Sequence, residues 1–388
     1  MMVAAPQAGA DEAFYVPPSP LPAGGNGEVI KQQPSNYPGT KATRIMYLSR
    51  NAKNQPIPVT GTIIVPTQAW TGAGPRPIVA YAPFTSGMGD QCAPSKTLVG
   101  EGAPDMTTSF QNSFVNGLLG KGFAVAQTDY EGLGTPGEHP YAMRLSEART
   151  TLDVLRAAQR LPGTGLDPRA PLGIAGYSEG GGAAASAAEM ASSYAPELPI
   201  KGVYSGAAPA DKATLAKALD GGMYAGFLGY ALIGIDTAYP ESHIGDLANA
   251  AGQQFLEEAR KTCTVEAVFK YLFKQSSSLT KDGRPVSAYL SQAPFDRIVA
   301  ENRIGTAKPA APVLVQHSAF DDVIPYNVGK QLAKDWCAQG ADIEFRDLFV
   351  FSPFLAHALG LTSAAGEASN WLADRFAGKP TASNCAKP

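Results

Sequence analysis

The segment around residue 178 places the strongest constraint on what this chain can fold into. The apolar run PLGIAGY at 171–177 is typical of a buried strand, and the alanine-rich segment after Ser178 is typical of a helix. Gly176 and Gly180 flank the serine, as a sharp strand-to-helix turn requires, because the flanking positions there must be small. The segment therefore predicts a tight turn that exposes Ser178 above a sheet. An incidental serine in a glycine-rich turn is the alternative.

Strand-like and helix-like segments alternate along most of the chain. Expected strands cover 43–51, 58–66, 76–84, 123–130, 171–177, 200–209, 311–320 and 342–349. Expected helices cover 110–122, 145–161, the alanine-rich segment after Ser178, 327–339 and the C-terminal region. This alternation predicts an α/β fold with a mostly parallel central sheet and helices on both faces.

Two regions depart from the alternation. Residues 1–40 are rich in proline and glycine and are expected to form an extended N-terminal arm. Residues 210–305 look mainly helical, and an insertion there would lie above the carboxyl ends of the strands, where open α/β sheets bind ligands. The expected organisation is therefore an arm (1–40), a first core part (41–209), a helical cap (210–305) and a second core part (306–388).

Composition excludes several classes of protein. The net charge of −3, without a basic run, argues against a nucleic-acid partner. No uncharged apolar run reaches membrane-spanning length, and the first residues show no signal peptide. The four cysteines form no Cys-x-x-Cys pair and lie beside no histidine cluster, so no metal site is expected. Their spacing alone fits two disulfides or four buried thiols equally well.

A nucleophilic serine needs a histidine base, which in this fold class follows the serine and an acid along the chain. Four histidines are present. His139 precedes the serine, His243 lies in the helical insertion, and His317 lies inside an expected strand as a packed or supporting residue. His357 follows the last expected strand and precedes the C-terminal helix, so it is the expected base. A helix-capping or surface histidine is the alternative there.

The acid is expected directly after the strand at 311–320. Asp321 and Asp322 lie there, whereas the later candidates lie in a helix or near the next strand: Asp335, Asp342 and Asp347. Aspartate is also common in surface turns, which is the alternative for this pair. Asp321 is favoured because it is the first residue beyond the strand, and Asp322 is expected nearer to solvent.

Two backbone N–H groups are expected to stabilise an oxyanion. One belongs to Glu179, directly after the serine, with its carboxylate directed away from the oxyanion. The other belongs to Thr85 or Ser86, in the loop after the strand at 76–84. These groups predict acyl transfer to water through Ser178 without a metal or cofactor. The apolar run at 221–235 is a candidate acyl-chain wall, with an ordinary buried helix as the alternative.

The chain resembles the secretory lipases, a family of α/β hydrolases that includes fungal lipase A and bacterial relatives. The resemblance rests on FYVPPSPLP, GDQCAPS, TDYEGLGTPGEHPY, GYSEGG, DDVIPY and the histidine before the last helix. It implies an α/β-hydrolase core with a helical cap before the acid strand, and secretion. The residues that it implies are the triad Ser178, Asp321 and His357 and the disulfides Cys92–Cys263 and Cys337–Cys385.

The chain departs from the family pattern at two places. Glu179 follows the nucleophile, where family members commonly have glycine or glutamine, and the oxyanion loop reads PFTSG, where a glycine usually precedes the threonine. The expected function is that of a lipase or carboxylesterase acting on small-molecule or lipid esters, with transient contact to a lipid interface. A polyester hydrolase of the same mechanism, a serine peptidase and a catalytically dead binding module are the alternatives.

Overall fold

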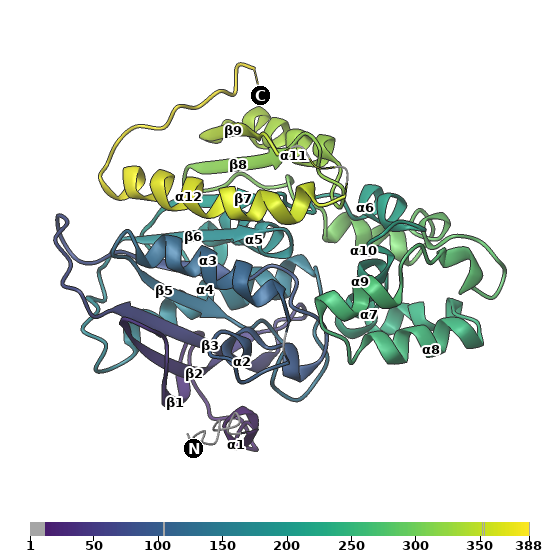
Figure 1. The fold of residues 1–388 in the computed structure, drawn as a ribbon, viewed down its shortest axis with the longest axis horizontal. Coiled ribbons are helices and arrows are strands. Elements are labelled where there is room, and N and C mark those ends of the chain that lie inside the picture. The colour runs from purple at the N-terminus through teal and green to yellow at the C-terminus, as the bar shows by residue number, and fades with distance from the viewer. Residues whose placement is uncertain (1–11, 104, 351, 353, 388) are drawn as a thin grey trace, which may run out of the picture.

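One mixed sheet forms the centre of the molecule (Figure 1). The computed structural model describes residues 12–103, 105–350, 352 and 354–387, so residues 1–11, with most of the segment examined for a signal peptide, lie outside the described residues. The sheet has nine strands in the order β1-β2-β3-β5-β4-β6-β7-β8-β9. Their bounds are Val29–Ser35, Thr40–Arg50, Pro56–Pro66, Ile78–Ala82, Ala124–Thr128, Leu172–Tyr177, Ile200–Gly206, Val313–Ser318 and Ile343–Leu348 for β1 to β9.

The pairing of the strands confirms the predicted α/β fold. β1, β2, β3 and β5 pair antiparallel, and all pairs from β5 through β4 to β9 are parallel. The central strands β4, β5, β6 and β8 are buried along their whole length. Such continuous burial is expected of parallel strands that are covered on both faces, and it explains their uninterrupted apolar sequences.

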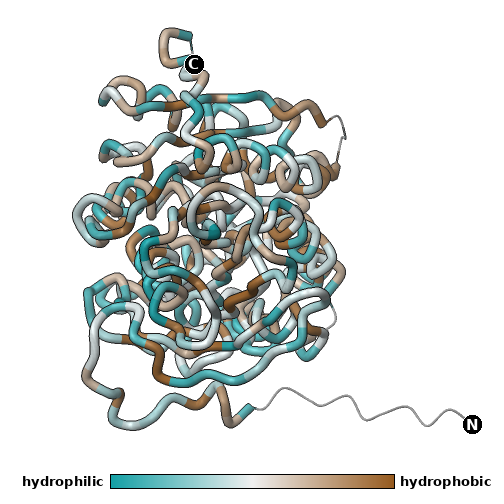
Figure 2. Tube along the Cα trace, turned by 90° about the vertical axis from the view of Figure 1, so that its left-hand side faces the viewer, coloured by the Kyte–Doolittle hydropathy of each residue, from teal (hydrophilic) through white to brown (hydrophobic). Residues whose placement is uncertain are grey.

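Helices cover both faces of this sheet. α3 (Thr107–Leu119) and α12 (Ala356–Phe376) pack together against one face. α4 (Arg144–Arg160), α5 (Glu179–Tyr194) and α11 (Tyr326–Ala338) cover the other face. In Figure 2 the hydrophobic segments run mainly through the interior and the hydrophilic ones along much of the outside.

Residues 210–305, here called the cap segment, lie between β7 and β8 in the chain. They contain α6 (Lys212–Leu219), α7 (Ala225–Ala238), α8 (Ala250–Ala259), α9 (Thr264–Lys270) and α10 (Phe295–Glu301), joined by short 3₁₀ turns. These helices gather at one end of the sheet, on the right in Figure 1. The disulfide Cys92–Cys263 joins the cap segment to the core, and Cys337–Cys385 joins α11 to the C-terminal tail. These are the two pairs that the family resemblance implies.

The N-terminal segment differs from the expected extended arm. It contains α1 (Glu12–Tyr15) and β1, which pairs with β2 as the edge strand of the sheet. The polar sequence of β1 and its Pro34 hid this strand, because an edge strand tolerates proline and has little apolar pattern. Tyr15 is buried, and its hydroxyl lies 2.8 Å from Ser95 Oγ. Within the described residues, no helix has the length and hydropathy needed to span a membrane.

Candidate active site

Ser178 occupies a strained turn between β6 and α5. Its backbone has φ 59° and ψ −124°, a conformation that L residues rarely adopt outside functional turns. A Cβ atom on Gly176 would lie 2.1 Å from the Gly180 carbonyl oxygen, and one on Gly180 would lie 2.0 Å from the Ala82 carbonyl oxygen. Both contacts are too short for any side chain. The two glycines are therefore sterically required, which gives the Gly-x-Ser-x-Gly spacing its physical reason.

The structure brings together the three residues predicted as nucleophile, base and acid. The Nε2 atom of His357 lies 2.9 Å from Ser178 Oγ, and its Nδ1 atom lies 2.8 Å from Asp321 Oδ2. His357 lies in the first turn of α12, and Asp321 follows β8, so the three residues come from separate segments at the same end of the sheet. The imidazole thus bridges a hydroxyl and a carboxylate, which is the arrangement that activates a serine.

The Asp321 carboxylate is held by more than the imidazole. Its Oδ1 atom accepts hydrogen bonds from the N–H groups of Val323 (3.0 Å) and Ile324 (2.8 Å). Burial raises its pKa, but the charge and hydrogen bond of His357, with help from His317, outweigh burial and lower the pKa. Asp321 is therefore an anion at neutral pH, as an orienting acid must be.

His317 is buried behind this carboxylate. Its Nε2 atom donates to the Ile324 carbonyl oxygen at 2.9 Å and lies 3.5 Å from Asp321 Oδ2. A Cβ on Gly329 would lie 2.2 Å from its Nδ1, so α11 packs directly on the ring. His317 thus supports the acid loop, in agreement with its interpretation as a packed or supporting residue.

Asp322 is half-buried and has hydrogen-bond partners of its own. Its Oδ1 atom accepts the backbone N–H of His357 at 2.8 Å, and its Oδ2 atom accepts the hydroxyl of Tyr224 at 3.1 Å. Tyr224 belongs to the cap segment. Asp322 therefore fixes the backbone of the base and contacts the cap, roles that adjacency in sequence to Asp321 could not reveal.

The remaining histidine and aspartate candidates lie in other surroundings. Asp335 pairs with Arg303, Asp342 accepts from Thr381, and Asp347 accepts from Tyr326. His243 is exposed in the cap segment, and His139 is buried against Glu179.

The oxyanion loop after β4 is tied to the cap segment. Thr264 donates through its hydroxyl to the Thr85 carbonyl oxygen (2.6 Å) and through its N–H to the Ser86 carbonyl oxygen (3.1 Å). The Ser86 hydroxyl accepts from Gln111 at 3.0 Å, whereas the Thr85 hydroxyl lies 2.8 Å from that of Tyr141. Thr85, unlike Ser86, is among the described residues that line the cavity containing Ser178, which favours Thr85 of the two candidates.

That cavity has a volume of about 620 Å³ and is lined almost entirely by apolar side chains. Phe84, Phe110 and Leu361 come from the core, and Met223, Phe227 and Val268 come from the cap segment. Of the run at 221–235, therefore, the first part lines the cavity, while Tyr230 and Ile233 are buried in the hydrophobic core. Phe269 and Phe273 also line the cavity although they are 71% and 65% exposed, so its mouth is apolar too.

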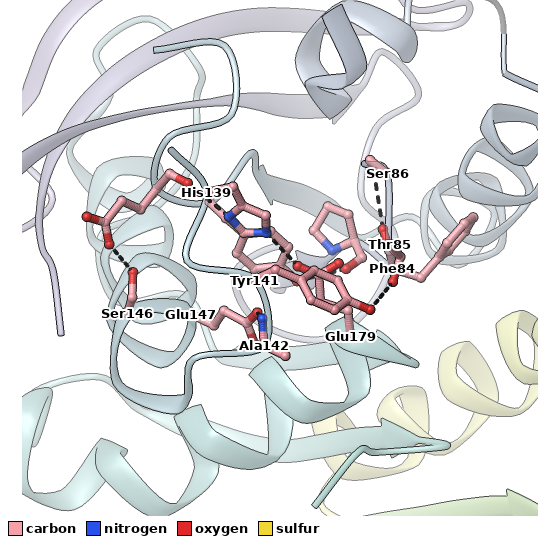
Figure 3. Close-up of polar contacts among 12 residues, drawn as sticks. Phe84, Thr85, Ser86, His139, Tyr141, Ala142, Ser146, Glu147 and Glu179 are labelled. Atoms are coloured by element: carbon pink, nitrogen blue, oxygen red, sulfur yellow. Dashed lines mark hydrogen bonds and ion pairs between the residues drawn. The ribbon is translucent and has the colours of Figure 1, made fainter. Parts of the chain in front are cut away.

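A buried polar cluster lies beneath the turn and was missed by the sequence analysis. The Glu179 carboxyl points to His139, with Nε2 and Oε1 2.8 Å apart, and Glu147 lies beside them (Figure 3). The candidate ligand atoms of these three residues lie within 4.8 Å of one another, a spacing that would suit a metal ion. Each of the three already has a hydrogen-bond partner. Two sequence signals pointed to it: the motif TDYEGLGTPGEHPY, which carries His139, and Glu179 at a position where glycine or glutamine is common.

Comparison with known proteins identifies the family of the chain. Residues 100–384 match the family model for secretory lipases. A protein of Mycobacterium tuberculosis named as a probable inactive lipase is 30% identical over 386 residues, covering 95% of this chain and 83% of its own. A secreted triacylglycerol lipase of Malassezia globosa is 28% identical, covering 97% and 83%.

Solved structures give the same assignment. Lipase A of Candida antarctica in its closed state superposes with a TM-score of 0.83 at 26% identity, covering 97% of this chain and 88% of that one. The cell-wall-degrading esterase of Xanthomonas oryzae has a TM-score of 0.76 at 17% identity, covering 90% and 99%, a likeness of fold. The lipases of Malassezia globosa and Candida antarctica support a lipase or esterase function. The chain belongs to the secretory lipase family.

Proposed function

We propose that the protein hydrolyses carboxylic esters through an acyl-enzyme on Ser178, with His357 as base and Asp321 as orienting acid. One observation carries the proposal: the continuous hydrogen-bonded path from Ser178 Oγ through the imidazole to the Asp321 carboxylate. This path supports catalysis beyond what family membership does, because one relative is named as a probable inactive lipase.

Acylation begins when Ser178 Oγ attacks the ester carbonyl carbon while His357 Nε2 takes the hydroxyl proton. Asp321 accepts the Nδ1 hydrogen and stabilises the imidazolium that forms. The N–H groups of Glu179 and Thr85 stabilise the oxyanion, each contributing on the order of 3 kcal/mol. The imidazolium then protonates the departing alkoxide, and a water molecule activated by His357 releases the acid from the acyl-enzyme.

The proposed substrate is an ester with an apolar acyl group. The cavity of about 620 Å³ beside Ser178 offers aromatic and aliphatic walls and almost no polar surface, which suits an acyl chain. A peptide would need polar partners for its backbone in such a site. The exposed Phe269 and Phe273 at the mouth favour transient contact with a lipid interface.

An extracellular site of action is part of the proposal. The relatives of Malassezia globosa are named as secreted lipases. The two disulfides Cys92–Cys263 and Cys337–Cys385 fit an oxidising compartment, where such bonds form and persist.

The test is the activity of Ser178→Ala on p-nitrophenyl esters of short to long chain, beside a peptide amide. The variant should fold but lose nearly all ester hydrolysis, and a fluorophosphonate should label the wild-type protein at Ser178 alone. Ser192→Ala, an exposed serine on the same helix, is the matched control and should keep full activity and labelling. Ester hydrolysis above a few per cent of wild type in Ser178→Ala would contradict the assignment.

A further inference from the structure

The residue after the nucleophile belongs to a buried proton-sharing cluster. Glu179 is the first residue of α5, and its carboxyl points away from the cavity to His139, in the loop after β5. Glu147 of α4 completes the cluster, and its Oε1 atom accepts the N–H of Ala142 at 2.6 Å. His139 is 0% exposed, and the two glutamates are 3% exposed each. Three titratable groups thus lie out of water, next to the reacting serine.

The hydrogen bonds of His139 restrict its protonation. Its Nδ1 atom lies 2.9 Å from the Glu131 carbonyl oxygen, which can only accept, so Nδ1 carries a hydrogen. Two arrangements then satisfy the 2.8 Å contact between Nε2 and Glu179 Oε1. Either the imidazole is neutral and a protonated Glu179 donates to it, or an imidazolium donates to a Glu179 carboxylate.

The surroundings favour the first arrangement, in which the His139 imidazole is neutral and the Glu179 carboxyl is protonated. The charged groups that face Glu179 are Glu147 from α4 and Lys212 from α6, and Glu131 faces His139 from its own loop. The hydroxyls of Tyr130 and Tyr141 also face the cluster. Among the described residues, a single lysine therefore faces the two buried carboxyls of Glu147 and Glu179. Two adjacent carboxylates cannot both ionise out of water without a large cost in free energy.

The direction of the pKa shifts agrees with this count of charges. Burial, opposed by hydrogen bonds to Glu147 and Thr85, raises the pKa of Glu179 to about 8. Burial likewise lowers the pKa of His139 and raises that of Glu147. At neutral pH, Glu179 is thus a carboxylic acid that donates to a neutral His139.

We propose that Glu179 is a positioning residue that keeps the oxyanion site free of negative charge by holding a proton between its carboxyl and His139, so that loss of this proton in alkaline solution slows acylation. The inference rests on the proposed role of Ser178. It gives a reason for a residue at which the chain departs from the common glycine or glutamine. A protonated glutamate and a glutamine have nearly the same shape, and each offers an acceptor oxygen and a neutral donor group.

The physical basis of this effect is that one residue carries both the expected oxyanion donor and a carboxyl group. The N–H of Glu179 is the expected oxyanion donor, and its carboxyl lies on the same residue, so a carboxylate there would oppose the charge that develops on the substrate. The effect reaches the second donor as well. The Thr85 hydroxyl interacts with the Glu179 carboxyl and lies 2.8 Å from the Tyr141 hydroxyl, so ionisation of Glu179 would reorganise the hydrogen bonds that hold the oxyanion loop (Figure 3).

The experiment compares kcat/KM on a soluble short-chain p-nitrophenyl ester across neutral and alkaline pH. Since the proton is present below the pKa of about 8 and lost above it, the wild-type value should fall about tenfold one pH unit above that pKa. Glu179→Gln has no proton to lose, so its ratio of alkaline to neutral rate should stay within about twofold. Circular dichroism at both pH values checks that the fold is intact.

Glu131→Gln is the matched control, because it makes the same change in a carboxyl that faces His139 from a neighbouring loop position. It should keep the wild-type alkaline fall. A second test is an infrared carbonyl band of a protonated carboxylic acid, present at neutral pH and lost in alkaline solution in the wild type. The same band in Glu147→Gln would assign it to Glu179 rather than to Glu147, whose pKa is also raised, so this test does not depend on the folding of Glu179→Gln.

Three results would overturn the inference: a wild-type profile without an alkaline fall, an unchanged fall in Glu179→Gln, or one equivalent of tightly bound metal in the purified protein. The proposed function fails in a different way. If fluorophosphonate does not label Ser178 at neutral pH, the nucleophile is wrong. If labelling is normal but the alkaline fall persists in Glu179→Gln, only the role of Glu179 is wrong.

Discussion

Replacing Asp321 by asparagine tests the orientation of the base most directly. The amide can be placed in two ways. If its NH₂ group takes the place of Oδ1, it faces the N–H groups of Val323 and Ile324, and both hydrogen bonds are lost. Leaving buried donors unpaired costs about 1–3 kcal/mol each, so this orientation is disfavoured. The NH₂ group therefore faces His357 Nδ1, where the carboxylate oxygen was.

In that orientation Nδ1 of His357 must accept a hydrogen bond, and the ring hydrogen moves to Nε2. The atom 2.9 Å from Ser178 Oγ is then a donor and cannot take the hydroxyl proton. A base held in the wrong tautomer costs about 10⁴ in turnover, which corresponds to about 5.5 kcal/mol of transition-state stabilisation. The loss should appear in kcat with little change in KM, because Asp321 is not one of the described residues that line the substrate cavity.

The assay is the rate on one soluble ester at neutral pH, with circular dichroism and thermal unfolding to check the fold. Asp322→Asn makes the same chemical change one residue away and serves as the control. If Asp321→Asn keeps more than about one per cent of the activity, the tautomer argument fails. If Asp322→Asn has the larger effect, the acid is Asp322, and the expected register of the loop is wrong by one residue.

The remaining predictions follow from the same contacts. Asp322→Asn should cost less than about tenfold, because its amide oxygen can still accept the N–H of His357, whereas Asp322→Ala should cost more in kcat. Thiol titration in denaturant without reductant should find no free cysteine, and four free thiols would contradict both disulfides. The raised pKa of Glu179 means that the folded state binds its proton more tightly, so stability falls as pH rises from 4.5 to about 8. The melting temperature of the wild type should therefore fall relative to that of Glu179→Gln as pH rises across that window.

Much of the fold could be predicted because its signals are local. Buried parallel strands are uninterrupted apolar runs. Each expected strand from 43–51 onward overlaps one of the strands β2 to β9, although β2 and β3 begin earlier than expected. The exception is β1, whose burial is partial along its length and whose pairing with β2 is a tertiary contact. An edge strand needs only one partner and one packed face, so its sequence carries little of the pattern that identifies the others.

The positions of Ser178, His357 and Asp321 could be predicted from order along the chain. In this fold the residues after β6, after β8 and at the start of α12 meet at one end of the sheet, whatever the intervening sequence. The role of Asp322 could not be predicted in this way. It depends on the hydrogen bond from the His357 N–H to the Asp322 carboxylate and on the hydrogen bond from Tyr224, which lies in a distant segment. Order along a chain fixes neither of these contacts.

The cap segment joins the oxyanion loop at one point and the substrate cavity at another. Cys263 and Thr264 fasten the start of α9 to the core through the disulfide with Cys92 and the hydrogen bonds to Thr85 and Ser86. A few residues further on, the same segment presents exposed Phe269 and Phe273 to the mouth of the cavity. Any movement of the mouth that left the first point in place would also leave Thr85, the proposed second oxyanion donor, in place. Under the proposed function, the fixed end of α9 would let the apolar rim contact a lipid substrate without displacing that donor.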